Sequence, residues 1–202
     1  MGVFLLSASL QSAFVFAEGY DSAEKGLAKL AHWKHFVKKN RNKNNWQKMH
    51  LVNQYFNQFH YVTDETLWSM NDYWAMPTEF IALGAGDCED FAIAKFFTLL
   101  AMGVEAQNLR LTYMMRTSDQ IAHMVLIVFE GGSHQPLVLD NASEHIKLLG
   151  ERKDLDPVYS FNLEGLWLAQ SRDSLNQYVG DAAQIKRWKA ISSETLSDFA
   201  EI

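Results

Sequence analysis

The chain has 202 residues, of which 48% are hydrophobic, so it can bury one sizeable core and its length requires no second domain. Eighteen basic and 24 acidic residues give a formal net charge of −6. This balance argues against a nucleic-acid partner, because such partners normally bind a basic surface. The sequence contains a single cysteine, which excludes an internal disulfide.

Residues 3–17 are apolar and rich in small side chains, and the sequence becomes polar at Glu18. This pattern is typical of a secretory signal, with Val15 and Ala17 at the −3 and −1 positions of a cleavage site, although basic residues before the apolar run are missing. The segment is short for a membrane span, which needs about 20 residues. We therefore expect residues 1–17 to be a signal-like segment and residues 18–202 to be one domain without membrane insertion. A buried first helix is the alternative for the apolar segment.

Two amphipathic helices are predicted next, at residues 21–37 and 45–59, because apolar side chains recur there at helical spacing. The basic turn between them is interspersed with asparagines, and we interpret it as solvated. Residues 61–79 are aromatic and irregular, which favours an ordered loop. The run at residues 91–102 is nearly all apolar, with Lys95 as its only charge, and predicts a buried central helix.

Cys88 lies at the start of this central helix, after a glycine-broken loop. Backbone N–H groups and the helix dipole favour a thiolate at such a position. Unpaired cysteines are more often buried as small hydrophobic residues, so the position alone decides little. A nucleophilic thiol also needs a base and a third group that orients the base, and the role of Cys88 depends on those partners.

The remainder of the chain predicts strands, followed by helices near the end. The predicted strands are residues 109–115, 122–129, 137–140 and 160–168. One or two short helices are expected around residues 182–190 and 193–199. Because helices come first and strands later, we expect an α+β fold in which the early helices pack on an antiparallel sheet.

His123 and Asp140 are the best candidates for the partners of Cys88. His123 opens one predicted strand, and Asp140 closes the next one. Counting across the hairpin of residues 130–135 places Asp140 opposite residues 123–125, so both side chains lie at the same end of the sheet. The sequence does not fix the register that decides whether they share a face. We interpret His123 as the base and Asp140 as the carboxylate that orients it.

Five segments give this constellation a specific context: DYWAMP (72–77), GAGDCEDFAIAKFF (84–97), AHMVL (122–126), PLVLDN (136–141) and VYSFNLEGLWL (158–168). In this combination the chain resembles the bacterial transglutaminase-like cysteine proteinases of the LapG type. The resemblance implies a papain-like, transglutaminase-like core, with Cys88 as nucleophile, His123 as base and Asp140 as orienting group. No departure from the family pattern affects these three residues.

The same resemblance implies a biological role. Proteases of this type are periplasmic, calcium-dependent endopeptidases that cleave the N-terminal region of large biofilm adhesins, typically beside paired alanines, and so release the adhesin from the cell surface. The periplasmic domain of an inner-membrane cyclic-di-GMP receptor sequesters them. We therefore expect a binding surface for that receptor near the cleft.

Asp87, Glu89 and Asp90 place three carboxylates around the thiol, and uncompensated negative charge would raise its pKa. Helix capping is one explanation, because acidic residues interact well with the first turn and Asp87 could be the cap. The other is Ca²⁺, which takes about six to eight oxygen ligands and which the resemblance favours. We expect Asp87, Glu89 and Asp90 to be metal ligands. No EF-hand loop is present, so further ligands must come from elsewhere.

Two other functions remain open at this point. A transglutaminase or another amine acyltransferase would use the same three residues but pass the acyl group to an amine, which the mass of the product reveals. A non-catalytic, calcium-dependent binding module would hold the three residues without using them. Failure of Cys88 to react with an alkylating reagent at neutral pH would favour the second alternative.

Overall fold

The computed structural model describes residues 23–130, 135–171 and 175–199. The signal-like segment predicted at residues 1–17 and most of the predicted hairpin loop lie outside these ranges. Within them, every helix is too short or too polar to cross a lipid bilayer.

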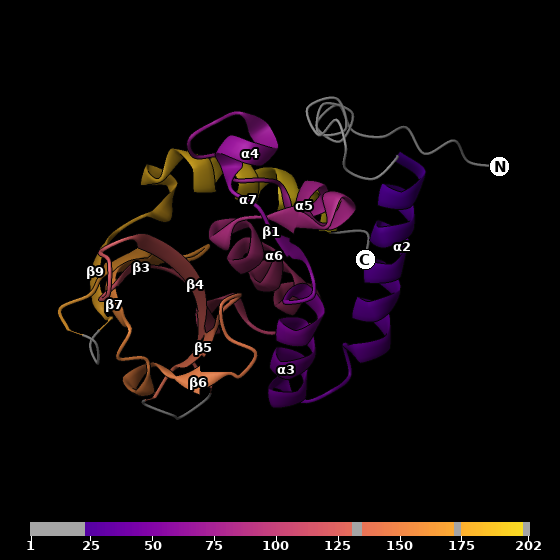
Figure 1. The fold of residues 1–202 in the computed structure, drawn as a ribbon. Helices are drawn as coiled ribbons and strands as arrows, with labels where there is room; N and C mark the ends of the chain where they lie inside the picture. The colour runs from indigo at the N-terminus through magenta and orange to yellow at the C-terminus, as the bar shows by residue number, and fades with distance from the viewer. Residues whose placement is uncertain (1–22, 131–134, 172–174, 200–202) are drawn as a thin grey trace.

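Two helices at the N-terminal side cover one flank of the molecule (Figure 1). They are α2 (Ala23–Asn40) and α3 (Asn45–Phe56), which confirms both predicted helices with small shifts at their ends. Asn44 caps α3, because its side chain accepts a hydrogen bond from the backbone of the first turn. The indole of Trp33 donates to Thr98 of the central helix at 3.0 Å and fixes α2 against it.

The segment predicted as an irregular loop is more ordered than expected. It contains α4 (Asp64–Trp68) and the start of α5 (Pro77–Leu83), whose first residue is a proline, as is common at this position. In addition, β1 (His60–Tyr61) forms a short parallel bridge with β2 (Ala85–Gly86). Elements of two to seven residues leave little periodicity to detect, which explains why the sequence did not predict them.

The β1–β2 bridge places the start of this segment beside the residues that precede Cys88. Tyr61 pairs with Gly86, two positions before the cysteine. A Cβ atom at Gly86 would collide with the carboxylate of Asp90 and the ring of Phe80, so only glycine allows this close approach. The bridge thereby places the segment that leads into α4 beside the N-terminal end of the helix that begins at Cys88.

The central helix, α6 (Cys88–Ala101), begins at the cysteine itself, three residues before the predicted start. Most of its side chains are buried, and it packs against α3, α5 and β4. Gly103 follows the helix with a φ of 83°, a conformation that glycine adopts without strain. The prediction of a buried helix with Cys88 at its tip is therefore confirmed.

A seven-stranded antiparallel sheet forms the other half of the molecule and curves away from α6 (Figure 1). In spatial order its strands are β6 (Lys147–Leu148), β5 (Leu137–Leu139), β4 (Ala122–Val128), β3 (Leu109–Arg116), β7 (Leu155–Phe161), β8 (Leu166–Leu168) and β9 (Gln177–Gly180). Three short 3-10 turns accompany them at Ala106–Asn108, Leu149–Glu151 and Ala182–Gln184. The predicted antiparallel sheet is thus confirmed, whereas β6 and β9 were not predicted.

Two predictions for the C-terminal third were wrong in detail. The segment at 160–168 is not one strand, because a turn at Asn162 divides it between β7 and β8. The Asn162 side chain accepts hydrogen bonds from the backbone of Glu164 and Gly165, which stabilises this turn. The tail forms a 3-10 turn and one helix of 14 residues, α7 (Lys186–Phe199), where one or two short helices were expected around residues 182–190 and 193–199.

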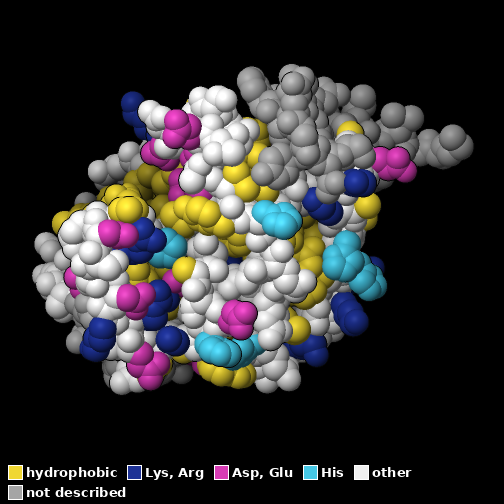
Figure 2. Space-filling view, viewed as in Figure 1, with side chains coloured by type: hydrophobic (Ala, Val, Ile, Leu, Met, Phe, Trp, Pro, Cys, Tyr) yellow, Lys and Arg dark blue, Asp and Glu magenta, His cyan; other side chains and the backbone are white. Residues whose placement is uncertain are grey.

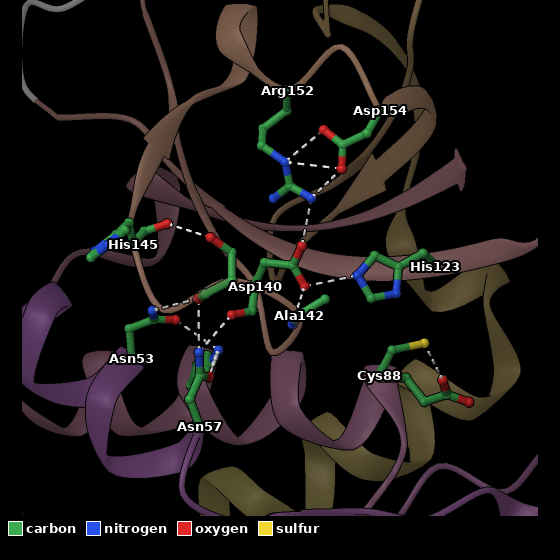
Figure 3. Close-up of polar contacts among 12 residues, drawn as sticks. Asn53, Asn57, Cys88, His123, Asp140, Ala142, His145, Arg152 and Asp154 are labelled. Atoms are coloured by element: carbon green, nitrogen blue, oxygen red, sulfur yellow. Dashed lines mark hydrogen bonds and ion pairs between the residues drawn. The ribbon is translucent and has the colours of Figure 1, made fainter. Parts of the chain in front are cut away.

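Alternation along the strands divides the core into two clusters. Met124 and Leu126 of β4 face the helices, whereas Val125 and Ile127 face the concave side of the sheet. His123 follows the second set by the same alternation. Because His123 is the second residue of β4, its side chain lies at one end of this strand, near the tip of α6 (Figure 3).

Candidate active site

The sheet brings His123 and Asp140 together. Leu126 pairs with Leu139, so Asp140 lies opposite Val125, within the predicted range. The imidazole Nε2 and the carboxylate Oδ1 are 2.8 Å apart, and both side chains are buried (Figure 3). This distance confirms that the two residues are neighbours, and the register places them on the same face of the sheet.

Asp140 is held as a carboxylate by several partners. Arg152 Nη2 lies 2.8 Å from its Oδ2, and the backbone N–H of Ala142 donates to its Oδ1 at 2.9 Å. Burial raises the pKa of Asp140, but the hydrogen bond and charge of His123, the Ala142 amide and the Arg152 guanidinium together hold it well below its ordinary value. An ionised Asp140 accepts a hydrogen bond from Nε2–H of His123.

This hydrogen bond decides which nitrogen of His123 is free to act as a base. With Nε2–H directed at Asp140, the lone pair of the neutral ring is on Nδ1. Figure 3 shows Nδ1 on the edge of the ring that is nearer to Cys88. This arrangement leaves Nδ1 available to accept a proton.

Cys88 is the first residue of α6 and is half-buried. Its sulfur lies on the side of the helix tip that faces the imidazole ring (Figure 3), and the backbone of Met124, the residue after His123, forms a hydrogen bond with it. The thiol donates its own hydrogen bond to Glu89 Oε2 at 3.2 Å. The backbone N–H of Cys88 has no intrahelical acceptor, since it belongs to the first turn.

Electrostatics in this arrangement oppose the thiolate. Burial raises the pKa of the Cys88 thiol, the charges of Glu89 and Asp87 raise it further, and the Met124 backbone hydrogen bond opposes these effects. The sequence predicted this effect from the three acidic neighbours. A thiolate at Cys88 requires that their negative charge be offset.

Five carboxylates converge beside Cys88. The side-chain oxygens of Asp64, Asp87 and Asp90 lie within 4.8 Å of one another, and the same holds for Asp64, Asp72 and Glu89. We call these five residues the carboxylate cluster. Figure 2 shows acidic side chains gathered over α4, the helix that carries Asp64. The cluster contains all three predicted metal ligands and two further residues from a preceding segment.

The hydrogen bonds within the cluster distinguish a residue that caps α6 from residues that could bind a metal ion. Asp90 accepts bonds from the backbone of Ala75 at 2.8 Å and of Asp87 at 3.2 Å, which is a capping role. In contrast, Asp64 Oδ1 and Asp87 Oδ1 are buried without a hydrogen-bond partner among the described residues. Buried carboxylate oxygens without donors suit a hard divalent cation. The residues present therefore fit a calcium ion.

Three carboxyl groups of the cluster have raised pKa values in the absence of a cation. Burial raises the pKa of Asp64 to about 6, although the Tyr73 backbone opposes the shift. Burial and the adjacent Glu89 raise the pKa of Asp87 to about 8, and the pKa of Asp90 also lies well above its ordinary value. These shifts arise because several negative charges share a poorly solvated space. A divalent cation would compete with these protons.

Sequence reasoning missed Asp64, Asp72 and Arg152. Asp72 lies in the DYWAMP segment, which was noted for the family resemblance and could have suggested a role. Asp64 and Arg152 carry no local signal, because an acidic residue at a helix start and a basic residue in a turn are common. Asp72 also forms an ion pair with Arg187, which links the cluster to α7.

A helix-borne thiol beside a His–Asp pair on an antiparallel sheet defines the class of transglutaminase-like cysteine enzymes. The family model of the bacterial transglutaminase-like cysteine proteinases (BTLCP) matches residues 28–154, more than half of the chain, and the chain belongs to this family. The predicted family and fold are confirmed. No curated protein sequence matches the chain.

Solved structures of Legionella pneumophila LapG are similar to this protein over nearly their whole length. One is 37% identical, with a TM-score of 0.75, and the match covers 93% of this chain and 97% of that one. An EGTA-treated structure is 38% identical, with a TM-score of 0.76 and the same coverage. A calcium-bound structure is 36% identical, with a TM-score of 0.73, and the match covers 92% of this chain and 98% of that one.

Proposed function

We propose that this protein is a calcium-dependent periplasmic cysteine endopeptidase that cleaves the N-terminal region of a large cell-surface adhesin and thereby promotes biofilm dispersal. The observation that carries the proposal is the thiol of Cys88 at a helix tip beside the His123–Asp140 pair. Membership of the BTLCP family and the likeness to LapG support it.

The three residues divide the chemistry between them. Nδ1 of His123 takes the proton of the Cys88 thiol, and the thiolate attacks a peptide carbonyl carbon. The backbone N–H of Cys88 stabilises the oxyanion. His123 then returns the proton to the leaving amine, which leaves a thioester on Cys88. Water activated by the same imidazole hydrolyses the thioester, while Asp140 stabilises each imidazolium that forms.

The carboxylate cluster would hold the calcium ion, and two of its members, Asp64 and Asp87, offer buried oxygens without donors. The ion would supply positive charge that offsets the carboxylates beside the thiol. Glu89, which accepts a hydrogen bond from the thiol in the metal-free arrangement, is a member of the same cluster. The calcium-bound and EGTA-treated LapG structures support calcium as the metal.

The same family likeness supports a proposal for location and control. Residues 1–17 have the composition of a secretory signal, which supports export to the periplasm. We propose that the periplasmic domain of an inner-membrane cyclic-di-GMP receptor binds near the cleft and sequesters the protease. When the protease dissociates from the receptor, it would cleave the adhesin and thereby release it.

Cleavage of an adhesin fragment tests this function. We expect the purified protein, supplied with Ca²⁺, to cut the N-terminal fragment of a large adhesin beside paired alanines, and to stop when EGTA is added. Mass spectrometry of the products distinguishes hydrolysis from transfer to an added amine. Fragments extended by the amine would indicate an acyltransferase, and an intact adhesin bound only with calcium would indicate a binding module.

The effect of calcium on stability should depend on pH. Asp64 and Asp87 have pKa values raised above the ordinary value of 3.8 in the metal-free fold, so the folded state binds more protons than the unfolded state. The stability that they contribute is present below about pH 4 and is lost as the pH rises through about 6 and 8. We therefore expect CaCl₂, compared with EGTA, to raise the melting temperature more at about pH 8 than at about pH 5. Equal shifts at both pH values would contradict this assignment.

A further inference from the structure

Lys95 is a fully buried cation in the middle of α6. Its ammonium group donates to Asn53 Oδ1 at 2.8 Å and to Asn57 Oδ1 at 2.7 Å. Burial lowers the pKa of Lys95 to about 7, with the charge of Asp140 opposing the shift. A buried ammonium is costly, and a leucine or methionine would suit the apolar surroundings better. The lysine therefore requires an explanation other than core packing.

The two asparagines also form hydrogen bonds with the turn that follows β5, and so connect Lys95 to this turn. Asn57 Nδ2 donates to the backbone carbonyls of Asp140 and Ser143, both at 2.9 Å. Asn53 Nδ2 lies 3.4 Å from the carbonyl of Ser143 and 3.3 Å from that of Glu144. Figure 3 shows both amides directed from α3 towards this turn.

Lys95 sets the orientation of these amides. An ammonium only donates, so it holds the carbonyl oxygen of each asparagine and leaves the NH₂ group to face the turn. This turn also holds the Asp140 carboxylate, because the backbone N–H of Ala142 donates a hydrogen bond to Oδ1 of Asp140. The same oxygen contacts Nε2 of His123. A continuous series of hydrogen bonds thus runs from Lys95 to the imidazole.

We propose that Lys95 is a positioning residue that acts through Asn53 and Asn57 to fix the turn at 140–144, and with it the orientation of Asp140 and His123. We call Lys95, Asn53 and Asn57 the amide clamp. The proposal rests on the proposed function, because it assigns the clamp a role in aligning the base with the thiol. A displacement of about 1 Å in such a group can cost about 100-fold in rate.

The test compares Lys95→Met with Asn162→Ala in calcium-loaded protein, at a temperature well below both melting points. Asn162 is an equally buried asparagine whose side chain bonds to backbone far from the thiol, so it controls for loss of stability alone. Two readouts are needed: kcat and KM on an adhesin-derived peptide, and the proton NMR signal of His123 Nε2–H. This signal reports the bond to Asp140 without requiring proteolysis.

We expect Lys95→Met to lower kcat by about 100-fold with little change in KM, and to shift or broaden the downfield signal of His123 Nε2–H. Asn162→Ala should lower the melting temperature and leave kcat and the NMR signal unchanged. Wild-type kcat and an unchanged His123 signal in Lys95→Met would overturn the proposal.

Asn57→Ala provides a second variant if Lys95→Met does not fold. Asn57 is only half-buried, so its truncation is easier to accommodate, yet it removes the direct bond to the Asp140 carbonyl. The same loss of kcat and the same change in the His123 signal are expected, and their absence would again reject the clamp. If the wild type cleaves no peptide, the protease function fails, and the NMR comparison still decides the role of Lys95.

Discussion

Replacing Cys88 with alanine is expected to lower peptide cleavage by about 10⁴-fold or more while preserving the fold. Without the sulfur no thioester forms, and His123 and the oxyanion site can contribute only to direct attack by water, which is far slower. The rate is measured as single-turnover cleavage of the adhesin fragment in the presence of Ca²⁺. Because the chain has one cysteine, no other thiol can substitute for it.

Two controls accompany this variant. The calcium-induced rise in melting temperature should persist in Cys88→Ala, since the carboxylate cluster is intact, and this shows that the site region is folded. Cys88→Ser keeps a hydroxyl group near Glu89 but provides a much weaker nucleophile, so it should also be nearly inactive. Cleavage by the alanine variant at a rate near that of the wild type would refute the role of Cys88 as nucleophile.

Replacing Asp64 and Asp87 together with asparagine is expected to weaken calcium binding by about 100-fold or more, because ligand charge strongly sets calcium affinity. The two residues supply the buried oxygens that lack donors. Asparagine keeps the shape of each side chain, and at position 64 it keeps an acceptor for the Tyr73 amide. Titration calorimetry measures the affinity, and residual cleavage should no longer respond to EGTA.

Glu65→Gln is the matched control for this experiment. Glu65 is the neighbour of Asp64 on α4, but it is exposed and lies outside the carboxylate cluster. Its substitution removes one negative charge from the same helix, and we expect calcium affinity to stay at the wild-type value. Wild-type affinity in the Asp64→Asn, Asp87→Asn variant would show that calcium binds elsewhere.

The sequence predicted those parts of the site that depend on local pattern. The apolar run that makes α6 central also places Cys88 at its tip, and the short hairpin between β4 and β5 constrains His123 and Asp140 to neighbouring strands. Both relations connect residues that lie close in the chain or on periodic elements. Counting along the strands was therefore enough to predict that the histidine and the aspartate meet.

The parts that were missed depend on contacts without periodicity. Asp64 reaches the cluster because a two-residue bridge, β1–β2, joins its segment to the residues before Cys88. Lys95 is the only charge in an apolar run, but its partners lie 42 and 38 positions away, Asn53 on α3 and Asn57 directly after it. No propensity or spacing rule predicts such contacts, which follow only from how the helices pack.

The hydrogen bond between Asn57 and the Asp140 carbonyl joins residues 83 positions apart. Closing so long a loop costs chain entropy, which is recovered only when the sheet packs against the helices, so this contact requires that packing. Before that stage the chain has a thiol but no aligned base. A partly folded molecule is therefore expected to lack peptidase activity, which requires that the sheet and the helices have packed together.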